Sequence, residues 1–285
     1  MKKRHIKRKV KTFFITVGII ILIVIIYNQW NNFNDYYLNN EMIDQSNNND
    51  LSSNINYDEL TILERLEKLS TQDNRINTII DHYDDYPEEL LDMLSRNIEM
   101  IDFVVDYPEK QGQVYSDNVG KITKGTIPLL LQWDKRWGYA YYGKSSIAIS
   151  GCGPTALSMV IVGLTGDNTI TPYEVATFSE RNGYYLAGSG TSWSLMTEGA
   201  NHYGVMAKEI SLSKNRIFEA LEKGHPIICS VREGYFTTTG HFIVLVSIKN
   251  GKIEVHDPNS ISRSEVLWDY ERLEYQIKNL WEFSY

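Results

Sequence analysis

A cysteine flanked by two glycines, in the motif Gly-Cys-Gly-Pro-Thr at residues 151–155, is the residue best placed to do chemistry in this sequence. From residue 154 to 164 the apolar residues recur with the period of a helix that has one buried face. Pro154 suits the first turn of that helix because it has no N–H group to leave unpaired. We therefore expect the Cys152 thiol at a helix N-terminus, where unpaired N–H groups and the helix dipole favour a thiolate, the reactive form of cysteine. A small residue in a tight glycine-rich turn is the non-catalytic alternative.

A cysteine nucleophile needs a general base, and His241 is the histidine whose setting fits this role best. Gly240 precedes it and an apolar run at residues 242–248 follows, so His241 is expected at the first position of a strand. Strand ends are places where side chains project into clefts. A structural histidine is the alternative for this position. The remaining histidines lie in less suitable settings: His5, His82, His202, His225 and His256.

The base should in turn be oriented by a nearby Asp or Asn, and two residues qualify. An ideal hairpin at the Asn250-Gly251 turn brings Asp257 and Asn259 near His241 but places both on the opposite face of the sheet. Pro258 cannot continue the ladder, so the chain leaves the strand there and the ideal register no longer applies. Spacing alone does not choose between the two. A carboxylate would stabilise the imidazolium more strongly than an amide.

The elements that must position these residues follow an α+β order. Helical patterns occupy residues 192–203 and 214–222, and a further helix is expected to begin at Thr171-Pro172, with Thr171 as its cap. Strand patterns occupy residues 127–131, 227–231, 242–248 and 252–256, and residues 139–150 are expected to form an irregular loop. Helices followed by an antiparallel sheet predict the α+β class.

The N-terminal segment predicts a membrane anchor. Residues 12–30 form an uncharged apolar run that is long enough, at about 1.5 Å per residue, to span a bilayer. Residues 1–11 hold seven Lys or Arg residues and no acidic residue, so the N-terminus should stay in the cytoplasm and everything after Trp30 should lie outside. A cleaved signal peptide is disfavoured because no A-x-A-like site follows the apolar run.

Beyond the anchor, composition divides the chain into four parts. Residues 31–56 are rich in Asn, Asp and Ser and predict a flexible stalk. Residues 57–110 show helical patterns and predict a small helical region, and residues 111–126 form a polar linker before the domain at 127–285. The helical region could space this domain from the membrane, pack on it, or act as a pro-region that blocks the site. The sequence alone leaves these roles open.

Charge and cysteine content exclude other classes of protein. The net charge is −8, and without the basic tail 21 basic residues face 36 acidic ones, about −15, which leaves no basic face for nucleic acid. Cys152 and Cys229 are too few for a disulfide framework, and Cys229 lies in an apolar run typical of a buried strand. The sequence contains neither a C-x-x-C pair nor an H-x-x-x-H pair, so it predicts no metal site. Oligomeric state is not predictable from these features.

Several motifs, taken together and in their order, resemble a known family. They resemble the bacteriocin-processing (double-glycine leader) peptidases and their stand-alone relatives, which are papain-like cysteine peptidases. The resemblance covers roughly residues 127 to 283. Its motifs are Gln132 through Trp137, the Gly-Cys-Gly-Pro-Thr turn, Gly190-Thr191-Ser192-Trp193, Gly240-His241-Phe242-Ile243-Val244-Leu245 and Asp257-Pro258.

The resemblance implies a role for each matching residue. Cys152 would be the nucleophile, His241 the general base and acid, and Asp257 the residue that orients the histidine, with Asn259 as the alternative. Gln132 would donate to the oxyanion together with the Cys152 backbone N–H. No metal or organic cofactor is implied. Gln132 lies 20 residues before Cys152, farther than in the transporter-linked members, and no nucleotide-binding G-x-x-x-x-G-K-[ST] motif is present, so this would be a stand-alone type.

The function expected from these features is a membrane-anchored, extracytoplasmic cysteine peptidase that acts on a peptide or protein outside the cell. Trp193 would line its substrate cleft, although a core tryptophan is an equal alternative. The same triad could serve a cell-wall peptide amidase or a transpeptidase. An inactive papain-like module that only binds a peptide is a further alternative, but such a module would not need a complete set of catalytic residues.

Overall fold

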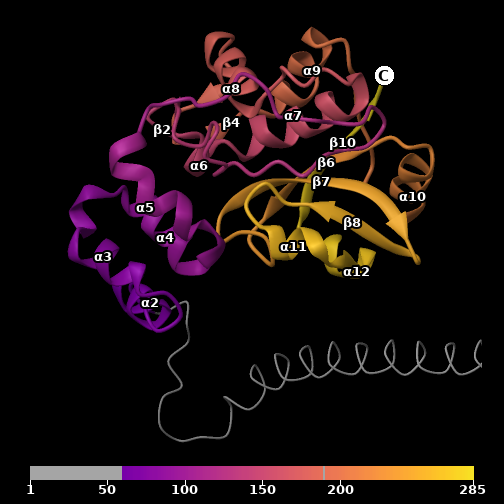
Figure 1. The fold of residues 1–285 in the computed structure, drawn as a ribbon. Helices are drawn as coiled ribbons and strands as arrows, with labels where there is room; N and C mark the ends of the chain where they lie inside the picture. The colour runs from indigo at the N-terminus through magenta and orange to yellow at the C-terminus, as the bar shows by residue number, and fades with distance from the viewer. Residues whose placement is uncertain (1–59, 189) are drawn as a thin grey trace, which may run out of the picture. The chain divides into compact units, whose positions relative to one another are not determined.

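The computed structural model describes residues 60–188 and 190–285, of which Thr61–Tyr285 form one compact unit (Figure 1). The predicted tail, anchor and stalk at residues 1–56 lie outside the described residues. Among the residues that are described, no helix combines the length and hydropathy needed to cross a bilayer.

A six-stranded antiparallel sheet organises the second half of the chain, as the α+β prediction requires, with the strand order β5-β10-β6-β7-β8-β9. The strands predicted at residues 227–231, 242–248 and 252–256 are confirmed as β6, β7 and β8. The predicted turn is also confirmed, because Lys249 pairs with Lys252. The strands are β5 (Met206–Glu209), β6 (Ile227–Arg232), β7 (Gly240–Lys249), β8 (Lys252–His256), β9 (Leu267–Trp268) and β10 (Ile277–Ser284).

Helices cover both faces of this sheet, so alternate residues of a central strand enter different cores. Phe242 and Val244 of β7 pack in the core with α7 (Cys152–Thr165) and α8 (Pro172–Arg181). Their neighbours Ile243 and Leu245 pack in a second core with α10 (Lys214–Glu222) and α12 (Tyr270–Leu273). Figure 1 shows α7 and α8 on one side of the sheet and α12 on the other. Burial on both faces explains why β6 and β7 read as continuous apolar runs.

The cysteine helix α7 is buried on almost every side, and eleven of its residues are buried. Burying each larger aliphatic side chain contributes roughly 1.5–3 kcal/mol, so this helix is a rigid base for the residue at its N-terminus. The next helix, α8, begins as predicted. The Thr171 side chain accepts a hydrogen bond from the Glu174 N–H (3.1 Å), and Pro172 occupies the first turn.

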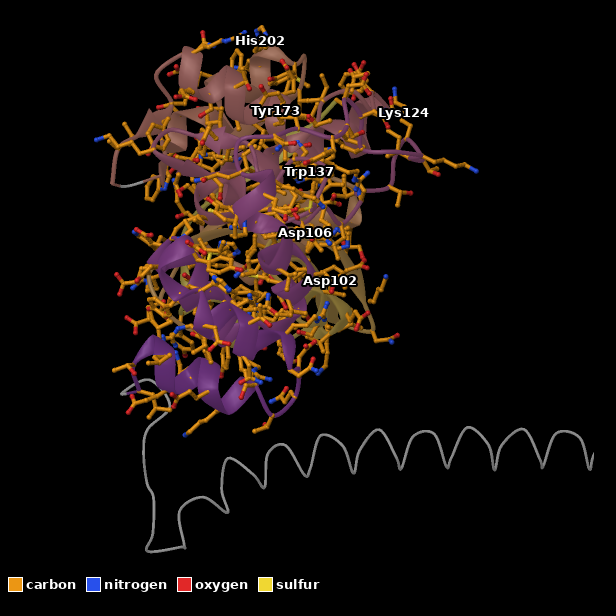
Figure 2. The ribbon with its side chains drawn as sticks, turned by 60° about the vertical axis from the view of Figure 1, so that its left-hand side comes forward. Asp102, Asp106, Lys124, Trp137, Tyr173 and His202 are labelled. Atoms are coloured by element: carbon orange, nitrogen blue, oxygen red, sulfur yellow. The ribbon has the colours of Figure 1, made fainter. Side chains whose placement is uncertain are left out.

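The helices before residue 110 form their own layer. These are α2 (Ile62–Leu69), α3 (Arg75–Asp81), η2 (Tyr83–Asp85), α4 (Glu88–Arg96), η3 (Ile98–Met100) and α5 (Ile101–Lys110). Their apolar core includes Trp133 and Tyr139, which come from the following segment of the chain. Asp106 of α5, which is labelled in Figure 2, also binds Lys135 (2.8 Å) of that segment. The layer is thus packed directly against the stretch that carries Gln132.

Three local predictions were wrong. Residues 127–131 do not pair as a strand, because Pro128 lacks an N–H group and Ile127 lies so close to α7 that a Cβ on Gly163 would come 2.9 Å from its Cα. The predicted loop at 139–150 contains the hairpin β1–β2 (Tyr141–Tyr142 and Ser145–Ser146) and the short helix α6 (Ile147–Ser150). The predicted helix at 192–203 is divided into η4 (Trp193–Met196) and α9 (Glu198–His202).

Candidate active site

Cys152 is the first residue of α7, and the two glycines beside it are required by close packing. A Cβ on Gly151 would lie 2.5 Å from the Ile147 carbonyl oxygen. This clash is with the backbone, so a side chain at this position would require the backbone to shift. A Cβ on Gly153 would lie 2.8 Å from the side chain of Thr191 in β4 (Gly190–Thr191). The first turn of a helix leaves backbone N–H groups without intrahelical acceptors, so the half-buried Cys152 thiol lies beside available donors.

The second group of the site is a buried pair formed by His241 and Asp257. The His241 Nε2 atom lies 2.7 Å from the Asp257 Oδ1 atom. Only 7% of the His241 side chain and none of the Asp257 side chain is exposed. His241 is the second residue of β7, in agreement with its predicted place at the start of a strand.

A β-bulge in the hairpin brings these two side chains to one face of the sheet. A hairpin without a bulge would pair Val244 with Asp257 and would separate the two side chains. Instead the register shifts by one residue between Leu245 and Ser247, and Val244 pairs with His256. Because a shift of one residue moves every following side chain to the other face, Asp257 now shares the face of His241. The ideal register therefore fails at this bulge, upstream of Pro258, where the sequence had led us to expect it to fail.

The charge state of His241 is set by these neighbours. Burial by itself lowers the pKa of His241, but the charge and hydrogen bond of Asp257, together with the side chain of Cys152, outweigh burial and raise that pKa to about 9. Because Nε2 is directed to Asp257, Nδ1 is the ring nitrogen that remains for the thiol. The arrangement therefore favours an imidazolium next to Cys152 at neutral pH.

Asp257 also binds Arg263, a residue that no sequence motif predicted. The Arg263 Nε–H donates to Asp257 Oδ2 (2.6 Å), and the Asn259 backbone N–H donates to Asp257 Oδ1 (2.8 Å). Burial would raise the pKa of Asp257, but His241 and Arg263 overcome this effect and lower it. The Asn259 side chain makes no hydrogen bond to His241 among the described residues, so it is the Asp257 carboxylate that contacts the imidazole. Neither the residue type nor the spacing of six residues predicts the contact between Arg263 and Asp257.

Gln132 is buried near the start of the cysteine helix, although 20 residues separate it from Cys152 in the sequence. Its Nε2 atom donates to the carbonyl oxygen of Ala148 (2.6 Å), four residues before Cys152. An amide nitrogen carries two hydrogens, so one donor remains for another acceptor. The Gln132 backbone N–H donates to the Pro258 carbonyl oxygen (2.8 Å), which links this residue to the loop of Asp257.

The residues near Gly153 form a further part of the site. The Tyr142 hydroxyl lies 2.9 Å from Thr191 Oγ1 and 2.7 Å from Ser179 Oγ, and this buried network supports the first turn of α7. Trp193 follows two residues after Thr191. Trp193 is 43% exposed and makes a T-shaped contact with the ring of Trp281, so it is not a core tryptophan.

The second cysteine lies apart from this arrangement. Cys229 is fully buried in β6, and burial raises the pKa of its thiol. Both cysteines are free. Among residues 60–188 and 190–285, no group of three or more His, Cys, Asp or Glu side chains is arranged to hold a metal ion. The site itself contains a thiol, an imidazole with a raised pKa, a buried carboxylate and an amide donor, which are groups used in acyl transfer.

Comparison with known proteins identifies relatives of this region. The model of the Peptidase_C39 like family matches residues 124–284, more than half of the chain. Two solved structures are similar. One is the peptidase domain of Streptococcus ComA, and ComA is described as a bi-functional ABC transporter involved in a quorum sensing pathway. This domain is 21% identical to the chain, with a TM-score of 0.38, and the match covers 47% of this chain and 91% of that domain. A protein from Bacillus anthracis described as a C39-like peptidase is 13% identical with a TM-score of 0.37, over 56% of this chain and 96% of its own. No curated protein matches the chain.

Proposed function

Because this chain belongs to the Peptidase_C39 like family and is a cysteine peptidase, we propose that its papain-like domain cleaves peptide bonds with Cys152, His241 and Asp257 as the catalytic triad. The observation that carries this assignment is the buried 2.7 Å contact between His241 and Asp257, next to the Cys152 side chain. The Asp257 carboxylate holds the imidazole in one orientation and stabilises its protonated form.

In the proposed reaction the Cys152 sulfur attacks the carbonyl carbon of a peptide bond. The carbonyl oxygen takes up negative charge in the tetrahedral intermediate. The carbon–nitrogen bond then breaks, and the amine leaves with the proton from His241. Water next gives a proton to His241 and attacks the thioester carbon. The carboxylic product leaves, and the thiolate and the imidazolium are restored.

The oxyanion is stabilised by the second Nε2 hydrogen of Gln132 and by the Cys152 backbone N–H. The bond from Gln132 to Ala148 supports this role because it holds the amide near the start of α7 before substrate binds. Donors that are fixed in advance cost no reorganisation when charge develops. The exposed ring of Trp193 would line the substrate cleft near Thr191.

Replacement of Gln132 by alanine is expected to lower kcat by roughly 10²- to 10³-fold with little change in KM, because the oxyanion exists only in the transition state and the intermediate. Steady-state kinetics with a cleaved peptide would measure both constants. Thermal unfolding of the variant is the control, since the Ala148 carbonyl also loses its donor. A change confined to KM would contradict the role of Gln132.

We place the domain outside the cell, anchored by residues 12–30, on the basis of their length, their hydropathy and the basic residues before them. The natural substrate is then an extracytoplasmic peptide or protein. This placement and the nucleophile are tested by one labelling experiment, because the two cysteines differ sharply in exposure.

Iodoacetamide is expected to alkylate Cys152 of the folded chain and to leave Cys229 unmodified, because Cys229 is fully buried. Peptide mapping by mass spectrometry would locate the modified thiol, and denatured protein, in which both thiols react, is the control. On intact cells, a thiol reagent that cannot cross membranes should label the same residue. Labelling of Cys152 only after cell lysis would contradict the outward orientation, and alkylation of Cys229 alone would contradict the assignment of the nucleophile.

A further inference from the structure

The loop that follows β8 folds back onto Asp257 through a short helix, α11 (Ile261–Glu265). The Ser264 hydroxyl oxygen accepts the Asp257 N–H (2.9 Å) and the same hydroxyl donates to the Ser260 carbonyl oxygen (2.7 Å). Arg263, from the middle of α11, reaches the Asp257 carboxylate (2.6 Å). The position of Asp257 therefore depends on that of α11. A helix of five residues is too short to be stable alone, so it must be held by other parts of the fold.

Glu99 of η3 holds the start of this helix, across more than 160 residues of sequence. Its Oε2 atom accepts the Ile261 N–H and its Oε1 atom accepts the Ser262 N–H, both at 2.8 Å. These are backbone donors that the first turn of a helix leaves unpaired. A carboxylate at this place is also favoured by the helix dipole. Both oxygens of one side chain thus fix the N-terminus of α11.

Asn97 holds the chain immediately before that helix. Its Nδ2 atom donates to the Asn259 carbonyl oxygen (2.6 Å), and its Oδ1 atom accepts the Glu99 N–H (3.1 Å). The two bonds need opposite ends of the amide, so its orientation is defined. Trp133, the residue after Gln132, donates to the same Asn259 carbonyl oxygen (3.1 Å). The segments of Asp257 and Gln132 and the N-terminal helices therefore meet at one carbonyl group.

We infer that Asn97 and Glu99 are positioning residues of the active site, which act through the loop of residues 257–264 to hold Asp257 against His241. The inference rests on the triad proposed above. Both residues lie before residue 124, where the match to the peptidase family begins. The helical layer is then a part of the catalytic scaffold. Its removal would lower activity, whereas removal of an inhibitory pro-region would raise it.

The test uses the full chain with Glu99→Ala, Glu99→Gln and Asn97→Asp. Glu99→Ala should lower kcat by roughly 10- to 100-fold with KM nearly unchanged, because small displacements of catalytic groups have effects of this size. Glu99→Gln keeps one acceptor and should lose less. Asn97→Asp keeps the acceptor for the Glu99 N–H but sets an acceptor against the Asn259 carbonyl, so it should also lose activity. Glu109→Gln, an exposed charge change in the same helical layer, should match the wild-type chain.

Two readouts separate positioning from a general loss of stability. When Asp257 is displaced, the pKa of His241 should fall, so the alkaline limb of the pH–rate profile should move to lower pH. Alkylation of Cys152 at mildly acidic pH should slow in parallel, and this measurement needs no substrate. In an Asp257→Ala background, Glu99→Ala should cause no further loss, because it acts through the missing carboxylate.

The inference is overturned if the Glu99 and Asn97 variants keep the wild-type kcat, pH profile and alkylation rate while only their melting temperatures change. It is also overturned if the losses from Glu99→Ala and Asp257→Ala multiply. Failure of the triad itself has a different signature, in which Cys152→Ala or His241→Ala cleaves peptide as the wild-type chain does. In that case the rate of Cys152 alkylation at mildly acidic pH would still report on the position of Asp257.

Discussion

Replacement of Cys152 by alanine is expected to abolish peptide cleavage, lowering kcat by about 10⁴-fold or more, because no other thiol can take its place. Cys229 is fully buried in the opposite core, and the two cysteines are the only ones in the chain. A peptide cleaved by the wild-type full chain, identified from a peptide library, is the substrate for this measurement. Circular dichroism should show an unchanged fold, since Cys152 is only half-buried.

Cys229→Ala is the matched control, because it removes the same sulfur atom from a position without a catalytic role. Its activity should equal that of the wild-type chain, and its free energy of unfolding should fall by about 1 kcal/mol for the lost buried atom. Cleavage that persists in Cys152→Ala would rule out the proposed nucleophile. The library profile would also separate peptide hydrolysis from attack on cell-wall crosslinks, which needs a different substrate.

Replacement of Asp257 by alanine should lower kcat/KM by roughly 10³-fold, because the imidazole loses its orienting partner and the stabilisation of its charge. Asp257→Asn keeps a hydrogen-bond acceptor but not the charge, so its loss should be smaller. The alkaline limb of activity, which follows loss of the proton from the His241 imidazolium, should move from near pH 9 to lower pH in both variants. Rates measured across this pH range would show the shift. Asp117→Ala, at an exposed aspartate, should leave the profile unchanged.

The same pair makes the stability of the fold depend on pH. The pKa of His241 in the folded chain, about 9, lies above its ordinary value of 6.5, so the folded state binds the proton more tightly than the unfolded state. The stabilisation is complete below about pH 6.5 and is lost as the pH rises through about 9. Asp257→Ala should weaken this dependence. Denaturant unfolding at several pH values would measure it, and an unchanged slope would contradict the coupling between the two residues.

Local signals identified the residues that could react. The glycines around Cys152 and the apolar period after it predicted the helix that carries the thiol, because both are properties of neighbouring residues. The same reasoning placed His241 at a strand start and Thr171 at a helix cap. These features depend on contacts within a few residues, so a single sequence contains enough information to predict them.

The contacts between distant segments could not be predicted in this way. The contact of His241 with Asp257 depends on a one-residue bulge near Val246, which no turn or composition signal marks. The approach of Gln132 to Ala148, and of Arg263 to Asp257, likewise depends on packing between separate elements.

The reactive groups of the chain could therefore be predicted from residue types and spacing. They are a thiol at a helix start, a histidine at a strand start and a carboxylate shortly after that strand. Their arrangement was determined by the tertiary fold, since a shift of one residue in a ladder decides which face a carboxylate occupies. The contacts of Asn97 and Glu99 with the loop after Asp257 have the same origin. These hydrogen bonds join residues more than 160 positions apart. One partner in each bond is a backbone group, which every residue has, so no residue type in the sequence marks the contact.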